Sequence, residues 1–143
     1  MNSAQQLLNC THKNAEMGKN TMEKLLPMIK DPGLRSVVQL QHDEYTRIFM
    51  SAEILLRSGG SDVSGVSAVA KVVGNMMIDI NTIASKSAPH IAKMLVEGTD
   101  RGIKEIDEAF AQYGVAASTE DHNLASAMRD ALYRNRRELQ RYL

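Results

Sequence analysis

The stretch from Ser87 to Tyr113 constrains the fold most strongly, because it predicts one long, uninterrupted helix. Ser87 suits an N-cap position, and Pro89 suits the first turn, where a missing N–H costs little. Gly114 follows the last periodic residue and is expected to end the helix in the left-handed conformation. About 26 residues at 1.5 Å each give a helix roughly 39 Å long, which favours a helical bundle over a small mixed fold.

This helix has one apolar face and one charged face. Its apolar and small residues recur at three- and four-residue steps, and they are Ile91, Leu95, Gly98, Gly102, Ile103, Ile106, Ala109, Phe110 and Tyr113. The charged face carries acids four residues before bases, as in Asp100 and Lys104. With 2 Phe, 4 Tyr and no Trp, the core must be built from aliphatic residues and 9 Met, which suits helix packing better than a β-sandwich.

The same periodicity predicts four further helices, so that the expected set covers approximately 3–30, 32–58, 66–85, 88–113 and 119–142. Pro27 should fray the end of the first helix. Asp31 and Pro32 suit the N-cap and first position of the second, so these two helices should form a tight antiparallel pair. Ser118 suits the cap of the last helix. The helix over 66–85 is interpreted as a crossover segment packed across the bundle.

Some small and polar residues fall on the predicted inner faces. Gly18, Gly98 and Gly102 each cost about 1 kcal/mol relative to alanine in a helix, so they predict close helix approach. Polar residues also lie on the inner stripes, and we interpret them as a buried hydrogen-bonded layer that fixes helix register. They are Thr11, Gln41, Tyr45 and Asn135.

Charge and composition limit the function classes. The 17 basic and 17 acidic side chains cancel, so no overall field points to nucleic acid or to an anionic membrane as partner. No window reaches 18 consecutive apolar residues and the first residues lack a signal-peptide pattern, so we expect a cytoplasmic protein. Cys10 stands alone and is expected to be a small apolar residue, not a nucleophile.

A basic cluster lies near the C-terminal end of the last predicted helix. Its members are Arg134, Arg136, Arg137 and Arg141. These arginines complement the negative end of the helix dipole, and the alternative is a phosphate-binding patch. Because Glu138 lies within the cluster, we favour the helix-end interpretation.

The chain resembles the ferritin-like superfamily, in particular its small bacterial four-helix-bundle members that lack the complete di-iron motif. The segments that carry the resemblance are KDPGLRSVVQLQHDEY, the glycine-rich break SGGSDVSG and EGTDRGIKEIDEAF. The resemblance implies an all-α antiparallel four-helix bundle, with a long crossover carrying an extra helix and residues 1–143 forming a single domain. In metal-binding relatives, two helices each supply a Glu and two each supply a Glu-x-x-His pair to a di-iron centre.

The Glu-x-x-His pattern is absent, because no glutamate in this chain is followed by histidine three residues later. A degenerate iron or manganese site would have to use other residues. The candidates are Glu16, Glu44, Glu97 and Asp100, with His12 or His90 as the nitrogen ligand. A solvated helix face explains the same carboxylates without a metal.

Three hypotheses follow. The first is a non-catalytic bundle that acts as a structural or interaction protein and forms a homo-oligomer such as a dimer. It is based on complete apolar seams and on the lack of a complete catalytic motif. The second is a degenerate metal-binding or oxidoreductase bundle. The third is a partner- or ligand-binding bundle, in which a mobile crossover helix over 66–85 opens a groove rich in Met and Val.

Overall fold

The computed structural model describes residues 3–59, 83 and 85–143. They form four α-helices and one short 3₁₀ helix. The elements are α1 (Ser3–Leu25), η1 (Leu26–Met28), α2 (Pro32–Ser58), α4 (Ala88–Tyr113) and α5 (Thr119–Gln140). The predicted helix over 66–85 falls almost entirely outside the described residues.

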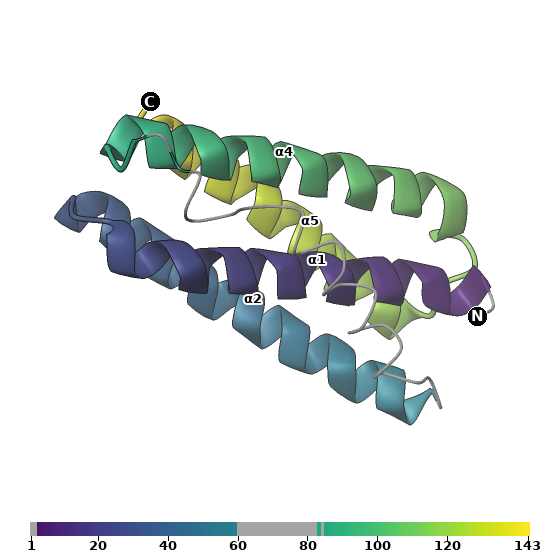
Figure 1. The fold of residues 1–143 in the computed structure, drawn as a ribbon. Helices are drawn as coiled ribbons and strands as arrows, with labels where there is room; N and C mark the ends of the chain where they lie inside the picture. The colour runs from purple at the N-terminus through teal and green to yellow at the C-terminus, as the bar shows by residue number, and fades with distance from the viewer. Residues whose placement is uncertain (1–2, 60–82, 84) are drawn as a thin grey trace.

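The four helices pack as an all-α bundle made of two antiparallel pairs, α1 with α2 and α4 with α5 (Figure 1). Helix α1 also contacts α4, and α2 also contacts α5, so the four helices enclose one core. Helix α2 ends and α4 begins at opposite ends of the bundle, and these two helices run in the same direction (Figure 1).

The first hairpin is as tight as its sequence predicts, but α1 is shorter than the predicted range 3–30. The α-helix ends at Leu25 and continues as the 3₁₀ turn that contains Pro27, because proline lacks the N–H and clashes with the carbonyl four residues earlier. Asp31 caps α2, its Oδ1 accepting from the Leu34 N–H at 2.9 Å. The Arg35 Nε donates to the Ile29 carbonyl at 3.0 Å and joins both ends of the turn.

The caps of the other helices follow the sequence, with one exception. Ser87 Oγ accepts from the His90 N–H, and Ser118 Oγ accepts from the Asp121 N–H, at 3.4 and 3.1 Å. Gly114 does follow α4, but its φ of −58° and ψ of −37° are right-handed. The prediction of a left-handed cap is therefore wrong. The Gly114 N–H donates to the Phe110 carbonyl, as in an ordinary α-helix.

The core is formed by the predicted seams. The buried residues on α1 and α2 include Leu8, Thr11, Ala15, Met22, Leu25, Leu34, Val38, Gln41, Tyr45, Ile48 and Ala52, and Ile29 is buried between the two helices. Those on α4 and α5 include Ile91, Leu95, Ile106, Ala109, Met128, Ala131, Asn135 and Leu139. None of the described helices combines the length and apolar character that a membrane-spanning segment needs.

Candidate functional site

The metal candidates on α4 lie at the surface. Glu97 and Asp100 are both exposed, and Asp100 pairs with Arg136 of α5 at 2.5 Å instead of with Lys104. His90 is half-buried in the first turn of α4. Asp100 therefore forms a solvent-exposed ion pair that links α4 to α5.

The candidates on α1 are buried against α2. His12 is 0% exposed and stacks on Phe49, with ring centroids 4.7 Å apart. Its Nε2 lies 3.5 Å from Glu53 Oε1. Burial lowers the pKa of His12 below its ordinary value, and the Glu53 carboxylate only partly offsets this effect. Glu16, one turn later, is 6% exposed.

Glu44 belongs to a third location. It forms an ion pair with Arg134 and accepts a hydrogen bond from Asn135 Nδ2 at 3.5 Å, so it faces α5. Glu44 thus pairs with an arginine of α5, as Asp100 does with another. Across residues 3–59 and 85–143, no group of three or more His, Cys, Asp or Glu side chains is placed to hold a metal ion.

The four inner polar residues are all buried, with Thr11 at 0% and Gln41, Tyr45 and Asn135 at 2% exposure. Three of them connect α2 to α5. Gln41 Nε2 donates to the Asn135 carbonyl at 3.4 Å, and the Tyr45 hydroxyl is hydrogen-bonded to the Asn135 side chain. Burial raises the pKa of Tyr45 to about 12. Thr11 is separate, since its Oγ1 donates to the Leu7 carbonyl of its own helix at 2.9 Å.

A cavity of about 320 Å³ lies between α1 and α4, and we call it the α1–α4 pocket. Tyr45 of α2 and Leu132 of α5 reach it from the other side of the core. The remaining lining residues are Asn14, Met17, Gly18, Thr21, Met22, Leu95, Gly98, Thr99, Arg101, Gly102 and Glu105. The surface of the pocket is mainly apolar. The sequence analysis does not predict this pocket.

All three inward glycines line this pocket, but they do so differently. A Cβ on Gly18 would lie 2.7 Å from the Tyr45 ring, and one on Gly102 would lie 3.2 Å from Leu132. At these two positions the predicted close approach is confirmed. Among residues 3–59, 83 and 85–143, a Cβ on Gly98 would meet only Arg101 Nη2 of its own helix, at 3.7 Å. No other described helix approaches Gly98 closely, so within this part of the chain the close-approach prediction fails at Gly98.

The pocket has few polar side chains, and two of them form hydrogen bonds to backbone carbonyls of their own helices. Thr99 Oγ1 donates to the Leu95 carbonyl at 2.7 Å, and Asn14 Nδ2 donates to the Cys10 carbonyl at 3.0 Å. Glu105 pairs with Lys13 at 3.4 Å across the α1–α4 contact. Arg101 is exposed at the pocket and forms no ion pair with another residue in the described part of the chain.

Cys10 lies one turn before Asn14 and is not activated. Its Sγ donates to the Glu105 carbonyl at 3.6 Å, and burial, followed by the nearby Glu105 charge, raises its pKa to about 11. The thiol therefore stays protonated near neutral pH, as expected for a residue with a packing role.

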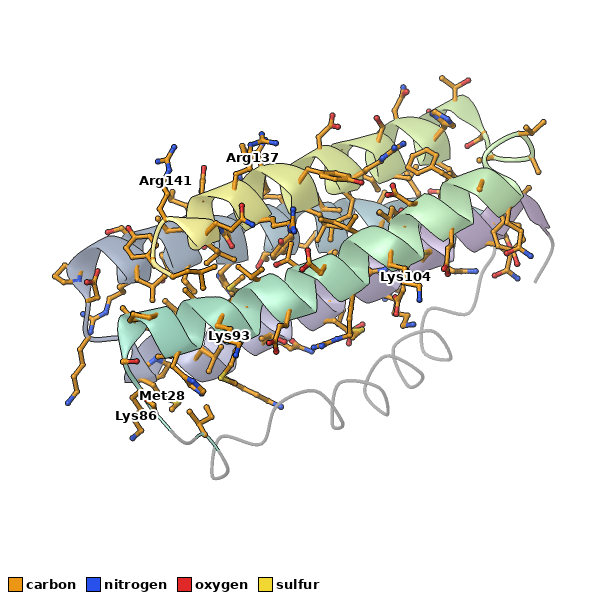
Figure 2. All side chains as sticks on the ribbon, turned by 90° about the horizontal axis from the view of Figure 1, so that it is seen from above. Met28, Lys86, Lys93, Lys104, Arg137 and Arg141 are labelled. Carbon is orange, nitrogen blue, oxygen red and sulfur yellow. The ribbon has the colours of Figure 1, made fainter. Side chains whose placement is uncertain are left out.

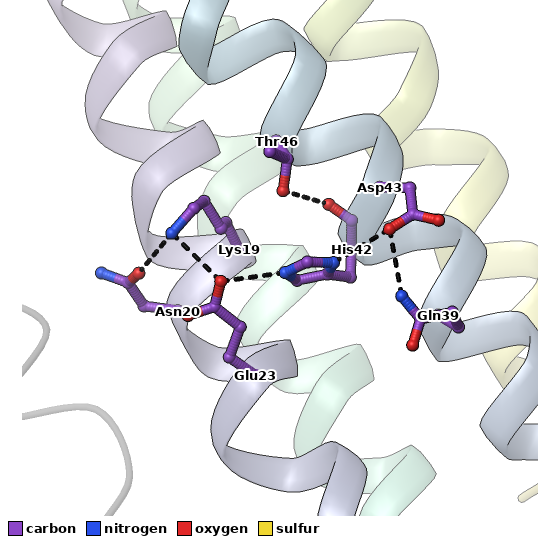
Figure 3. A network of polar contacts seen from close by, with 7 residues as sticks. All are labelled: Lys19, Asn20, Glu23, Gln39, His42, Asp43 and Thr46. Atoms are coloured by element: carbon purple, nitrogen blue, oxygen red, sulfur yellow. Dashed lines mark hydrogen bonds and ion pairs between the residues drawn. The ribbon is translucent and has the colours of Figure 1, made fainter.

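A second polar site, absent from the predictions, joins α1 and α2 (Figure 3). His42 Nε2 lies 3.0 Å from Glu23 Oε1, and its Nδ1 lies 3.1 Å from Asp43 Oδ1. Lys19 also pairs with Glu23, at 3.1 Å. Burial disfavours the charged imidazole, but the two carboxylates outweigh it and raise the pKa of His42 above its ordinary value.

The arginines of α5 do not gather into one patch. Arg134 and Arg136 turn to Glu44 of α2 and Asp100 of α4. Arg137 and Arg141 project outward from α5, on the opposite side of the molecule from Lys93 and Lys104 of α4 (Figure 2). The cations are therefore divided between inter-helix ion pairs and solvent, which does not favour the phosphate-patch alternative.

Comparison of the chain with protein-family models, curated proteins and solved structures finds no match.

Proposed function

We propose that the chain is a non-catalytic, ferritin-like helical bundle that binds a small amphipathic molecule in the α1–α4 pocket. The observation that carries the proposal is the cavity of about 320 Å³ next to Gly98, whose missing side chain leaves space between the described residues of α1 and α4. This volume falls at the lower end of the range of small-molecule sites, roughly 300–1,000 Å³.

The lining favours an apolar body for the ligand. Met17, Met22, Leu95 and Leu132 supply flexible aliphatic contacts, and methionine adapts its shape to irregular partners. Burial of apolar surface would supply most of the affinity, at about 25 cal/mol per Å² before the cost of association.

Arg101 favours an anionic or strongly polar head group. It lines the pocket, it is exposed, and no other described residue neutralises it. Glu105, by contrast, is already paired with Lys13. Thr99 and Asn14 are hydrogen-bonded within their own helices, so they suit orientation of a ligand better than reaction with it.

The ferritin-like part of the proposal is supported by helix direction. Two antiparallel pairs are joined so that α2 and α4 run the same way, which requires a long connection of the kind found in ferritin-like folds (Figure 1).

Decanoate and 1-decanol provide matched probes, because they share an apolar chain and differ in head-group charge. Isothermal titration should show binding of both to the unmodified protein, with Arg101→Gln weakening decanoate about tenfold and 1-decanol much less. Gly98→Phe, which fills the pocket, should abolish binding of both.

Ala111→Phe is the control, since Ala111 is exposed on α4 and does not line the pocket. Far-UV circular dichroism should show that all variants keep the helical fold. Equal binding by the Gly98→Phe and Ala111→Phe variants would place the probes elsewhere and remove the proposal. If Arg101→Gln weakened the affinity for decanoate and for 1-decanol equally, the preference for an anionic head group would be refuted, but the pocket proposal would stand.

A further inference from the structure

The outer face of α2 carries exposed apolar residues. Leu40, Met50 and Ile54 are 69%, 58% and 65% exposed. At 100° per residue these three side chains fall within an arc of about 80°, and they extend over roughly 21 Å of helix. Exposed apolar residues are often scattered singly, whereas these three share one face of the helix.

Two opposite charges interrupt the stripe. Asp43 and Arg47 lie between Leu40 and Met50 on the same face, Asp43 partly exposed and Arg47 exposed. Asp43 Oδ1 already accepts from Gln39 and contacts His42. We call the five residues Leu40, Asp43, Arg47, Met50 and Ile54 the α2 outer face.

The pattern is complementary to itself in one direction only. If two copies of α2 run antiparallel, with their midpoints at Tyr45, Leu40 of one copy lies opposite Met50 of the other. In the same register, Asp43 lies opposite Arg47 and Arg47 lies opposite Asp43. A parallel pair would place Asp43 against Asp43 and Arg47 against Arg47, which like-charge repulsion disfavours.

We propose that the α2 outer face binds a second copy of this chain, forming a two-fold symmetric dimer with antiparallel α2 helices. A two-fold interface uses the same patch on both subunits. Here that patch provides apolar layers on either side of a central layer of two acids and two arginines. Ile54 lies opposite Ser36, at the edge of the contact. The interface lies on α2, so it is separate from the α1–α4 pocket and does not depend on the proposed ligand.

The test measures the dimer dissociation constant by sedimentation equilibrium. The full chain should dimerise, and Leu40→Asp should weaken the dimer about tenfold or more. Val115→Asp is the matched control, since Val115 is a fully exposed apolar residue away from α2, at 105% exposure. It should leave the dissociation constant unchanged.

A charge exchange tests the register. Asp43→Arg and Arg47→Asp should each weaken the dimer about tenfold or more, because each places like charges opposite one another. The double variant restores opposite charges and should recover most of the lost affinity. Circular dichroism should show each variant to be folded, which matters because Asp43→Arg also removes the His42 contact.

A monomeric unmodified chain, or a dimer that Leu40→Asp leaves intact, would overturn the proposal. A double charge variant as weak as the single variants would overturn the antiparallel register.

Discussion

Gly18 and Gly98 offer one chemical change with two opposite expected results. Replacing either glycine with alanine should gain about 1 kcal/mol, because alanine loses less backbone entropy in a helix. At Gly98 little in the described part of the chain opposes this gain, since there the new Cβ would meet only Arg101 Nη2 at 3.7 Å. Gly98→Ala should therefore stabilise the protein by about 0.5–1 kcal/mol.

At Gly18 the same methyl group has no room. It would lie 2.7, 3.0 and 3.2 Å from three carbons of the Tyr45 ring. Tyr45 is 2% exposed and is hydrogen-bonded to Asn135, so the ring cannot move without loss of that contact. Overpacking costs about 1–3 kcal/mol, and a weakened hydrogen bond adds about 1 kcal/mol. After the propensity gain, Gly18→Ala should destabilise the protein by about 1–3 kcal/mol.

Urea unfolding followed by circular dichroism separates the two cases. A difference of about 2–3 kcal/mol, at a slope of about 2 kcal/mol per molar urea, separates the midpoints of Gly18→Ala and Gly98→Ala by roughly 1 M. Equal midpoints, or a Gly18→Ala protein more stable than the unmodified chain, would refute the proposed contact between α1 and the Tyr45 ring.

Three further predictions concern the buried and bridging polar groups. Burial lowers the pKa of His12, so the free energy of unfolding should decrease as pH drops below about 6.5 and the buried imidazole has to take up a proton. In urea titrations at pH 5 and 7, His12→Leu should show a smaller decrease between the two pH values than the unmodified protein. For His42 the pH dependence has the opposite sign, because its raised pKa gives stability that is full below about pH 6.5 and is lost as pH rises through the folded-state pKa. His42→Gln should therefore lower the free energy of unfolding more at pH 5.5 than at pH 8. An equal loss at both pH values would count against the Glu23 and Asp43 contacts. Asn135→Ala should cost about 1–3 kcal/mol in thermal or urea unfolding, because the buried Tyr45 hydroxyl loses its hydrogen bond to the Asn135 side chain, and a neutral change would show that this hydrogen bond does not stabilise the fold.

Much of the fold could be predicted because it depends on local signals. Asp31, Ser87 and Ser118 cap their helices through side chains that bond a backbone N–H three residues later, and that geometry is contained in the sequence. The apolar periodicity likewise identifies the face of each helix that is buried. The end of α1 at Leu25 was less predictable, because the 3₁₀ turn depends on how Pro27 is accommodated.

The sites were harder to predict because they depend on what lies opposite each residue. Gly18 and Gly98 are both glycines on predicted inner faces, yet Gly18 faces a tyrosine ring and Gly98 faces no other helix among the described residues. His42 has no carboxylate four residues away on its own helix, so the sequence offered no sign of its contact with Glu23 across the α1–α2 interface. Such contacts depend on the rotation and offset of neighbouring helices.

The metal candidates illustrate the same limit. Glu44 and Asp100 are metal candidates in the sequence, but each forms an ion pair with an arginine of α5. Residue type and spacing along a helix identify groups that could bind a metal. Convergence of those groups depends on the packing of several helices.

The contact between Gly33 and Tyr142 has a consequence for synthesis on the ribosome. A Cβ on Gly33 would lie 2.9 Å from the Tyr142 hydroxyl, so the residues just after α5 pack against the first turn of α2. At translation rates of about 5–20 residues per second, synthesis of the first hairpin is complete roughly 4–17 s before Tyr142 is added. During that interval the apolar faces of α1 and α2 have no α4 or α5 to cover them, and the nascent hairpin is a natural substrate for chaperones that bind exposed apolar helices.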